Sequence, residues 1–284
     1  MAITNFIPTV WSENLYKQLD QKYIGVANCS RDWEGEIKQY GDRVKICGVG
    51  PVSIFNYTKN TNLPDPTALT DSARDLIINQ AKAFNFQIDD IDAAQSKPNL
   101  MDAAIRQAAD ALANAADKYV YGLHDSVKEG NVLTISDVNE TNIISIILDA
   151  ILKLQSKGVR DGLILEVSPY VASLIFKAKI DLLSNNNSTL EKGCIGSIAG
   201  VKVYVSNNVQ IRCEGNDNFY QCFLRTKRAI TFAEQLSEIE AYRPELRFAD
   251  AVKGLHLYGA KIVYPDEILV LSLYFHDPDL IAAG

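Results

Sequence analysis

Residues 99–123 constrain the fold more than any other part of this sequence. They read NLMDAAIRQAADALANAADKYVYGL, and alanine is the best intrinsic helix former. Pro98 stops any earlier helix, Asn99 is suited to cap the first turn, and Gly122 marks the end. At the usual rise per residue the helix would be about 37 Å long, which is the width of a small domain. The segment therefore predicts a long, straight supporting helix.

One stripe along this predicted helix is apolar and consists mostly of small side chains. Residues three and four apart lie on the same face of a helix, so we expect this stripe to be the buried face. Strands or other helices can then approach the helix closely. The stripe consists of Ile105, Ala108, Leu112, Ala115, Ala116 and Tyr119.

The segment 50–75 has the opposite character, because it cannot bury a core of its own. It contains three prolines among Asn, Thr and Asp residues and few large apolar side chains. Residues 44–46 and 84–88 on either side alternate between apolar and polar, which predicts half-buried strands. We expect these strands to pair as the feet of a hairpin. Long connections usually serve partner binding or another function, so we interpret 50–75 as an extended two-stranded flap that lies on another subunit.

The N-terminal segment is a second candidate for subunit contact. Residues 1–10 are apolar without a regular period, and Trp11, Leu15 and Leu19 then recur four apart, which predicts a short amphipathic helix. The apolar side chains of this arm are expected to pack either on their own chain or on a neighbouring copy. The candidate contacts of the arm and the flap are Phe6, Ile7, Val10, Trp11, Ile54, Phe55, Tyr57, Lys59 and Leu63.

The remaining sequence predicts an α/β unit followed by strands. Residues 142–157 and 169–177 have helical periodicity on either side of a buried strand at 162–167. Beyond residue 200 the alternation favours strands, with at most a short helix at 249–253. The predicted strands are 201–205, 209–213, 219–224, 229–232, 255–263 and 268–275.

The charge balance argues against a protein whose main role is to bind nucleic-acid phosphates. The sequence has 28 basic and 35 acidic residues, which gives a formal charge of −7. A local basic strip remains compatible with this balance. Lys59 and the pair Lys227 and Arg228 could each meet an acidic partner or a phosphate, although solvated surface is the commoner role of such cations.

The sequence contains no motif for catalysis, nucleotide binding or metal binding. The spacings of a phosphate-binding loop, a zinc protease, a serine hydrolase and an EF-hand are all missing. Asp89, Asp90 and Asp92 are interpreted as solvated or helix-capping acids, and His124, His256 and His276 are isolated. We therefore predict no catalytic residue, no cofactor and no metal.

The cysteines and the apolar runs indicate an intracellular protein. None of the five cysteines forms a C-x-x-C pair, and we expect them to be reduced, packed thiols. The N-terminus lacks the pattern of a secretory leader, and no apolar run reaches about 18 residues. We expect a mature cytosolic product without a membrane span.

Several segments, taken in their order along the chain, resemble the major capsid protein of tailed bacteriophages, which has the Hong Kong 97-type fold. The resemblance spans nearly the whole chain, although each motif alone is weak. The segments are FIPTVW (6–11), RDWEGEI (31–37), GDRVKI (41–46), YTKNT (57–61), QAKAFNFQIDDIDAAQ (80–95), the alanine-rich helix and RFADAVKGLHLYGAKIVYPD (247–266).

This resemblance implies an α+β fold and a specific division of the chain. An N-terminal arm would precede an extended loop, which is a β-hairpin. A peripheral domain with a long spine helix at 99–123 and an α/β apical domain would follow. The implied boundaries are 1–40 for the arm, 41–90 for the extended loop, 91–138 with 229–266 for the peripheral domain, 139–228 for the apical domain, and 267–284 for a C-terminal strand and tail.

The resemblance also implies a structural role and no enzymatic one. The chain would assemble with itself, as hexamers and pentamers, into an icosahedral head that encloses double-stranded DNA without sequence-specific binding. It implies a separate scaffolding protein and a portal, a place in the virion capsid, and assembly in the cytoplasm of the bacterial host. Three alternatives remain open: an encapsulin-type nanocompartment shell, an α/β enzyme with a long lid at 50–75, and a phage tail or adaptor protein.

Overall fold

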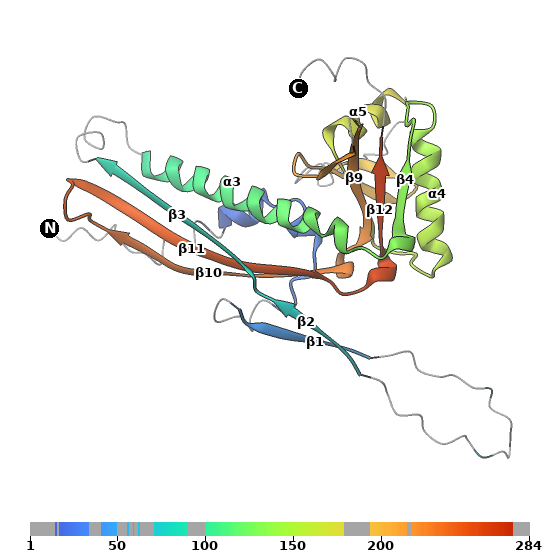
Figure 1. Ribbon diagram of the computed structural model, residues 1–284, viewed down its shortest axis with the longest axis horizontal. Coiled ribbons are helices and arrows are strands. Elements are labelled where there is room, and N and C mark those ends of the chain that lie inside the picture. The colour runs from blue at the N-terminus through green and yellow to red at the C-terminus, as the bar shows by residue number, and fades with distance from the viewer. Residues whose placement is uncertain are drawn as a thin grey trace.

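The computed structural model describes residues 15, 17–33, 41–49, 56, 59, 62, 71–89, 100–178, 194–214 and 217–274. Figure 1 shows an elongated part around helix α3 and, at one end of it, a compact part with helices α4 and α5. A two-stranded hairpin of β1 and β2 points away from both parts. Helices and strands are both abundant, so the chain has an α+β fold.

The elongated part is a three-stranded antiparallel sheet with one long helix lying along it. The strands are β3 (Gln80–Asp89), β10 (Ile230–Tyr242) and β11 (Ala249–Ile262), in the order β10, β11, β3. Helix α3 (Leu100–Tyr121) contacts the sheet through the rings of Tyr119 and Tyr258, whose centroids are 5.6 Å apart. The long helix predicted from the sequence is therefore confirmed (Figure 1).

The buried face of α3 is wider than the predicted stripe and is centred differently. Ala108, Ala115 and Tyr119 are only half-buried and lie at its border. The helix packs against β3, β11 and the N-terminal segment, and three neighbours cover more of a helix than one layer does. The buried residues are Ile105, Ala109, Leu112, Ala113, Ala116, Asp117, Val120 and Tyr121.

The compact part is a mixed sheet with two helices. Its strands follow the order β4, β12, β9, β5, β7, β6, and β8 pairs with β9. The helices are α4 (Ile143–Ser156) and α5 (Pro169–Lys177). The strands are β4 (Val132–Ile135), β5 (Leu163–Val167), β6 (Cys194–Ile198), β7 (Val201–Val205), β8 (Ile211–Glu214), β9 (Asp217–Thr226) and β12 (Ile268–Leu273).

Local signals place the two helices of the compact part where the sequence predicts them. Gly158 follows α4 with a φ of +91°, a conformation that glycine adopts without steric cost. Ser168 caps α5 by accepting a hydrogen bond from the backbone N–H of Val171 at 3.4 Å, and Pro169 occupies the first turn. The predicted strand between the helices is β5, and all of its residues are buried.

The hairpin is formed by β1 (Arg43–Val49) and β2 (Asp71–Ile77), whose ladder runs from Arg43 and Ile77 to Val49 and Asp71. The predicted pairing of 44–46 with 84–88 is therefore wrong. Residues 84–88 lie in β3, which pairs with β11, so β3 belongs to the elongated sheet and not to the hairpin. Segment 71–77 has little strand periodicity, and of its residues with described burial Leu76 is buried, Arg74 and Asp75 are half-buried and Ile77 is exposed.

A small cluster fixes the base of the hairpin against the elongated sheet. Val44, Ile46 and Leu76 are buried with Leu257 of β11. The chain passes so close to β11 that a Cβ added at Gly259 would lie 2.4 Å from the carbonyl oxygen of Ile77. The other buried side chains of the described residues belong mostly to one large core shared by the elongated and compact parts.

Two strands of the elongated sheet are longer than the sequence predicts. The expected short helix at 249–253 is wrong, because these residues begin β11. Likewise β10 continues beyond 229–232 to Tyr242. The two strands pair along almost their whole length, from Ile230 and Ile262 to Tyr242 and Ala251, and this long ladder overrides weak local alternation.

Candidate assembly site

A short N-terminal segment, residues 24–30, joins the elongated part to the compact part. We call it the joint segment. On α3, Asp117 accepts hydrogen bonds from the backbone N–H groups of Ile24 at 3.1 Å and Val26 at 2.9 Å. The backbone of Ser30 bonds to β10 on both sides of Thr231. The joint segment therefore contacts both the long helix and the long sheet.

The compact part holds the same segment through a buried ion pair. Arg225 on β9 and Glu166 on β5 are fully buried and share two hydrogen bonds, of 2.8 and 3.1 Å. Arg225 also donates to the carbonyl oxygens of Asn28 at 2.6 Å and Gly25 at 3.0 Å. The Asn28 amide donates to Glu166 at 3.0 Å. A buried charge is tolerated only when it is paired and hydrogen-bonded, and this pair meets that condition.

A second buried cluster fixes the residues just outside the joint segment. Glu234 on β10 accepts hydrogen bonds from the hydroxyl of Tyr23 at 2.5 Å and from Arg31 at 2.5 Å. His256 on β11 lies with Nε2 2.8 Å from the same carboxylate. Burial raises the pKa of Tyr23, and the adjacent Glu234 raises it further, so the hydroxyl stays protonated and donates.

The pKa of Asp117 reflects the burial of its side chain. Burial raises this pKa from 3.8 to about 6, although the backbone N–H groups of Val26, Ile24 and Gly25 lower it. Desolvation therefore outweighs the hydrogen bonds that favour the carboxylate. Folding should then bind a proton at Asp117 between these two pH values.

Sequence analysis missed both buried clusters, although one of them left a signal. Glu166 is the lone charge in the apolar strand LILEV, and Arg225 follows the apolar residues FYQCFL of β9. Opposite charges in two buried strands predict a pair once the strands are known to be neighbours. His256 was interpreted as isolated, but its Nε2 lies 2.8 Å from the carboxylate of Glu234, which is 22 residues away in the sequence.

Only one predicted contact residue lies in the described part of the chain. Lys59 is exposed, as expected of a residue in the flap. The others, namely Phe6, Ile7, Val10, Trp11, Ile54, Phe55, Tyr57 and Leu63, lie outside the described residues.

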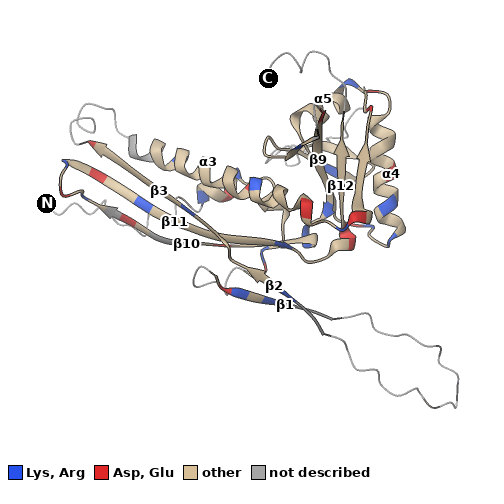
Figure 2. Ribbon diagram, viewed as in Figure 1, with Lys and Arg blue, Asp and Glu red and all other residues tan. Residues whose placement is uncertain are grey.

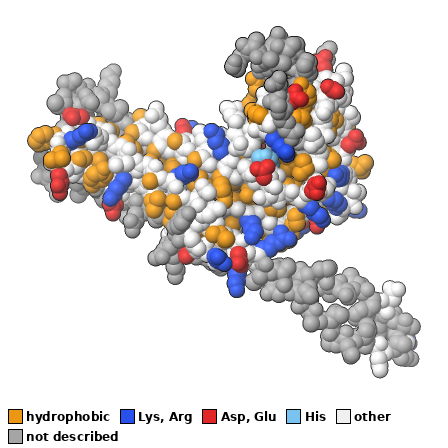
Figure 3. Space-filling model, viewed as in Figure 1, with side chains coloured by type: hydrophobic (Ala, Val, Ile, Leu, Met, Phe, Trp, Pro, Cys, Tyr) orange, Lys and Arg blue, Asp and Glu red, His pale blue; other side chains and the backbone are white. Residues whose placement is uncertain are grey.

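The structure adds an exposed apolar pair that the sequence did not single out. Leu246 and Phe248, in the connection between β10 and β11, are 97% and 82% exposed. They are the most exposed large hydrophobic residues described, and Figure 3 shows apolar side chains gathered at that end of the elongated part. Exposed apolar patches of this kind mark interaction surfaces.

The described residues offer little for metal or redox chemistry. Among them no three His, Cys, Asp or Glu side chains form a group that could hold a metal ion. Cys29, Cys194 and Cys222 are buried, and burial raises the pKa of Cys29 to about 11 and of Cys222 to about 12. Cys213 is exposed, which corrects the expectation of packed thiols there. None of the described helices is long and apolar enough to cross a membrane.

Comparisons with known proteins identify the fold. The sequence matches no family model and no curated protein. Among solved structures, a protein of Mycobacterium phage Che8 has 27% sequence identity and a TM-score of 0.67, over 88% of this chain and 90% of that one. The capsid of Ralstonia phage GP4 has 11% identity and a TM-score of 0.69, over 92% and 91%. This chain has the fold of tailed-phage major capsid proteins.

The capsid fold also occurs in shells that are not phage heads. The holo-SrpI encapsulin of Synechococcus elongatus has 11% identity and a TM-score of 0.59, over 85% of this chain and 86% of that one. In capsid-fold terms, β1 and β2 are the base of the extended loop, and α3 is the spine helix. The capsid-protein neighbours point to a structural role.

Proposed function

We propose that this chain is the major capsid protein of a tailed bacteriophage and builds an icosahedral head from hexamers and pentamers. The observation that carries this proposal is the match to phage capsid structures over about nine-tenths of the chain, including one at 27% identity. A match over 88% and 92% of this chain must include most of both the elongated and the compact part. A protein that had borrowed a single module would match over much less.

The structure of the subunit is suited to assembly into a closed shell. The joint segment and its two buried clusters hold the elongated and compact parts together as one body. The hairpin extends beyond the core (Figure 1), and Leu246 and Phe248 are exposed in the connection between β10 and β11, so a neighbouring copy can cover both. Closed shells form from many modest contacts of this kind, because the contacts act together once the geometry closes.

The proposal extends to partners and location. A separate scaffolding protein would guide assembly, a portal would occupy one vertex, and double-stranded DNA would fill the head without sequence-specific binding. The subunits would assemble in the cytoplasm of the bacterial host and end in the virion. The chain would have no catalytic activity, and the arm residues and flap residues named above would contact neighbouring copies.

An encapsulin-type compartment is the second candidate. It is favoured by the structural likeness to the SrpI encapsulin and to a virus-like particle from Pyrococcus furiosus, the latter at 12% identity, a TM-score of 0.57 and coverage of 95% and 100%. A compartment of that class would hold a cargo protein where a phage head holds DNA.

One preparation tests both candidates. The full chain is expressed in bacteria alone and with its genomic neighbours, and the purified material is viewed by negative-stain electron microscopy and assayed for nucleic acid and co-purified protein. We expect closed shells, with DNA inside when the packaging proteins are present. Shells that always contain one protein cargo and no DNA would favour the encapsulin. A chain that stays monomeric at all concentrations and salts would contradict both.

A further inference from the structure

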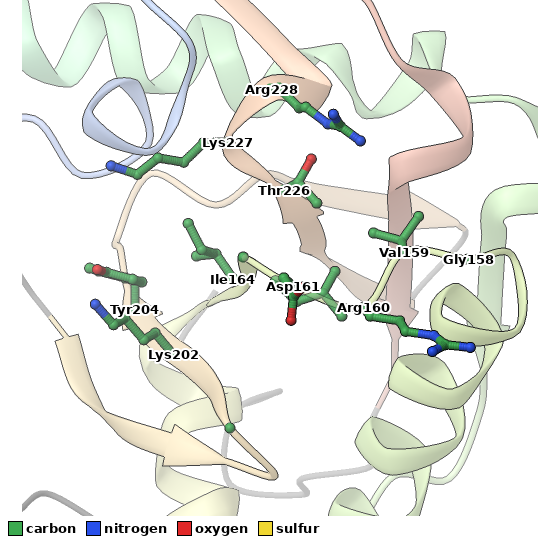
Figure 4. Close-up of a pocket in the computed structure, with 13 residues that line it drawn as sticks. Gly158, Val159, Arg160, Asp161, Ile164, Lys202, Tyr204, Thr226, Lys227 and Arg228 are labelled. Carbon is green, nitrogen blue, oxygen red and sulfur yellow. The ribbon is translucent and has the colours of Figure 1, made fainter. Parts of the chain in front are cut away.

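A hollow of about 860 Å³ lies at one end of the compact sheet. Its walls come from the connection between α4 and β5, the turn between β6 and β7, and the short helix η6 (Lys227–Ala229) after β9. Figure 4 shows the side chains around it. None of the lining residues belongs to the joint segment or to the Glu234 cluster, so neither of those structures explains the hollow.

Cationic side chains are concentrated at this hollow, although the chain as a whole is acidic and acidic residues occur on both the elongated and the compact part (Figure 2). The cationic residues that line it are Arg160, Lys202, Lys227 and Arg228. Asp161 also lines it, and Glu267 binds Arg228 through hydrogen bonds of 2.7 and 2.5 Å. Four cations against these two acids leave a surplus of two positive charges, in a chain whose formal charge is −7.

The cations surround the hollow and do not converge on one point. In Figure 4, Lys227 and Lys202 stand on one side with Tyr204 between them, and Arg160 stands on the other side. These three cations are exposed and form no hydrogen bond or ion pair with any residue that the structure describes. A single small anion would need donors that converge. Separated cations suit a ligand whose negative charges repeat along its length.

We propose that this hollow binds the backbone phosphates of the DNA that the shell encloses. The inference rests on the proposed function, and it places the hollow on the inner face of the shell. Lys and Arg contacts to phosphate supply most sequence-independent affinity for DNA. Burial raises the pKa of Tyr204, so its hydroxyl keeps a proton that it can donate to a phosphate oxygen.

The lining favours a phosphate backbone over an acidic peptide. Protein interfaces depend on apolar side chains that anchor the partner in the centre of the contact. Of the aliphatic side chains at this hollow, Leu163 and Ile164 are buried in β5 and Val159 is half-buried. No fully exposed aliphatic side chain therefore lines the hollow, whereas Arg160, Lys202, Lys227 and Arg228 are exposed there, which suits a ligand bound by its charges.

The test compares variants of the full chain, kept below the concentration at which it assembles. Binding of a fluorescein-labelled duplex of about 20 base pairs is followed by anisotropy as the salt concentration is raised. Lys202→Gln with Lys227→Gln should weaken binding by about tenfold or more, and the slope of log K against log salt should become shallower by about 2, because two phosphate contacts are lost. Lys202→Arg with Lys227→Arg should restore both quantities.

The matched control removes the same charge elsewhere. Lys45 on β1 and Lys82 on β3 are exposed and lie away from the hollow, so Lys45→Gln with Lys82→Gln should leave affinity and slope almost unchanged. Equal losses in the two pairs would overturn the inference, since binding would then follow net charge alone. Tight binding of polyglutamate at the hollow without binding of the duplex would also overturn the inference, because it would identify an acidic peptide as the ligand.

Assembly is scored separately by electron microscopy. If the wild type and the Lys202→Gln, Lys227→Gln variant form the same shells and bind the duplex equally, the inference fails and the proposed function stands. If the wild type forms no shells, the proposed function fails, whatever the duplex measurements give.

Discussion

The joint segment and the hairpin are both held by the elongated sheet, but in opposite ways. The joint segment is fixed by buried charges from α3, β5 and β9 and by backbone hydrogen bonds to β10. The described part of the hairpin is held near its base, by a small apolar cluster and by two hydrogen bonds to β11, from Arg74 to the carbonyl oxygen of Ile262 and from Lys261 to that of Asp75. The joint segment therefore fixes how the elongated and compact parts are arranged within one subunit. The hairpin, in contrast, is available for contact with a neighbouring subunit.

The largest expected loss of stability comes from breaking the buried ion pair. Arg225→Met leaves Glu166 without its charge partner and should lower the free energy of unfolding by about 3–5 kcal/mol, measured by urea denaturation. Arg225→Met with Glu166→Met should recover most of this loss, because no unpaired charge remains. A loss in the double variant as large as in the single variant would show that the pair is not what stabilises the joint.

Asp117 should make stability depend on pH. Its folded pKa of about 6 lies above its ordinary value of 3.8, so its contribution is fully present below about pH 4 and is lost as the pH rises through about 6. Between pH 4 and 7 the wild type should lose about 1–3 kcal/mol more than Asp117→Asn. The measurement is urea denaturation at a series of pH values, and parallel curves for the two proteins would refute the expectation.

Shortening the hairpin should separate folding from assembly. Because Val49 faces Asp71 at the end of the ladder, residues 50–70 can be replaced by the two-residue turn Asn-Gly. The free energy of unfolding should change by less than about 1 kcal/mol, since the segment has few large apolar side chains that could contribute to a core. Shells should be absent by electron microscopy. If this variant formed normal shells, the flap would not be required for assembly.

The apolar tip should have the smallest effect on the isolated subunit. Leu246→Ser with Phe248→Ser should change unfolding by less than about 0.5 kcal/mol, because both side chains are exposed. The concentration needed for assembly should rise about tenfold or more if neighbours bury these side chains. It is measured by sedimentation, with Leu246→Met and Phe248→Leu as the apolar control. An unchanged assembly concentration would show that the tip stays in solvent.

Local sequence signals predicted the helices and failed for strand partners. The alanines of α3, the cap at Ser168 and the turn glycine Gly158 act within a few residues, so they could be found without the fold. β1 pairs with β2, whereas β3 pairs with β11. This choice of partners depends on contacts between segments far apart in the sequence, which no local pattern encodes. The same limit applies to the buried clusters. Tyr23 and Glu234 are 211 residues apart, so their contact could not be predicted from spacing.

The sequence separation of the joint contacts has a consequence for synthesis on the ribosome. Residues 23–28 leave the exit tunnel early, yet their partners Arg225 and Glu234 are translated roughly 200 residues later. The N-terminal residues therefore cannot form their native contacts until most of the chain has been translated. Nascent and prematurely terminated products lack the finished shape that sister molecules recognise. The order of translation thus delays polymerisation until each copy is nearly complete.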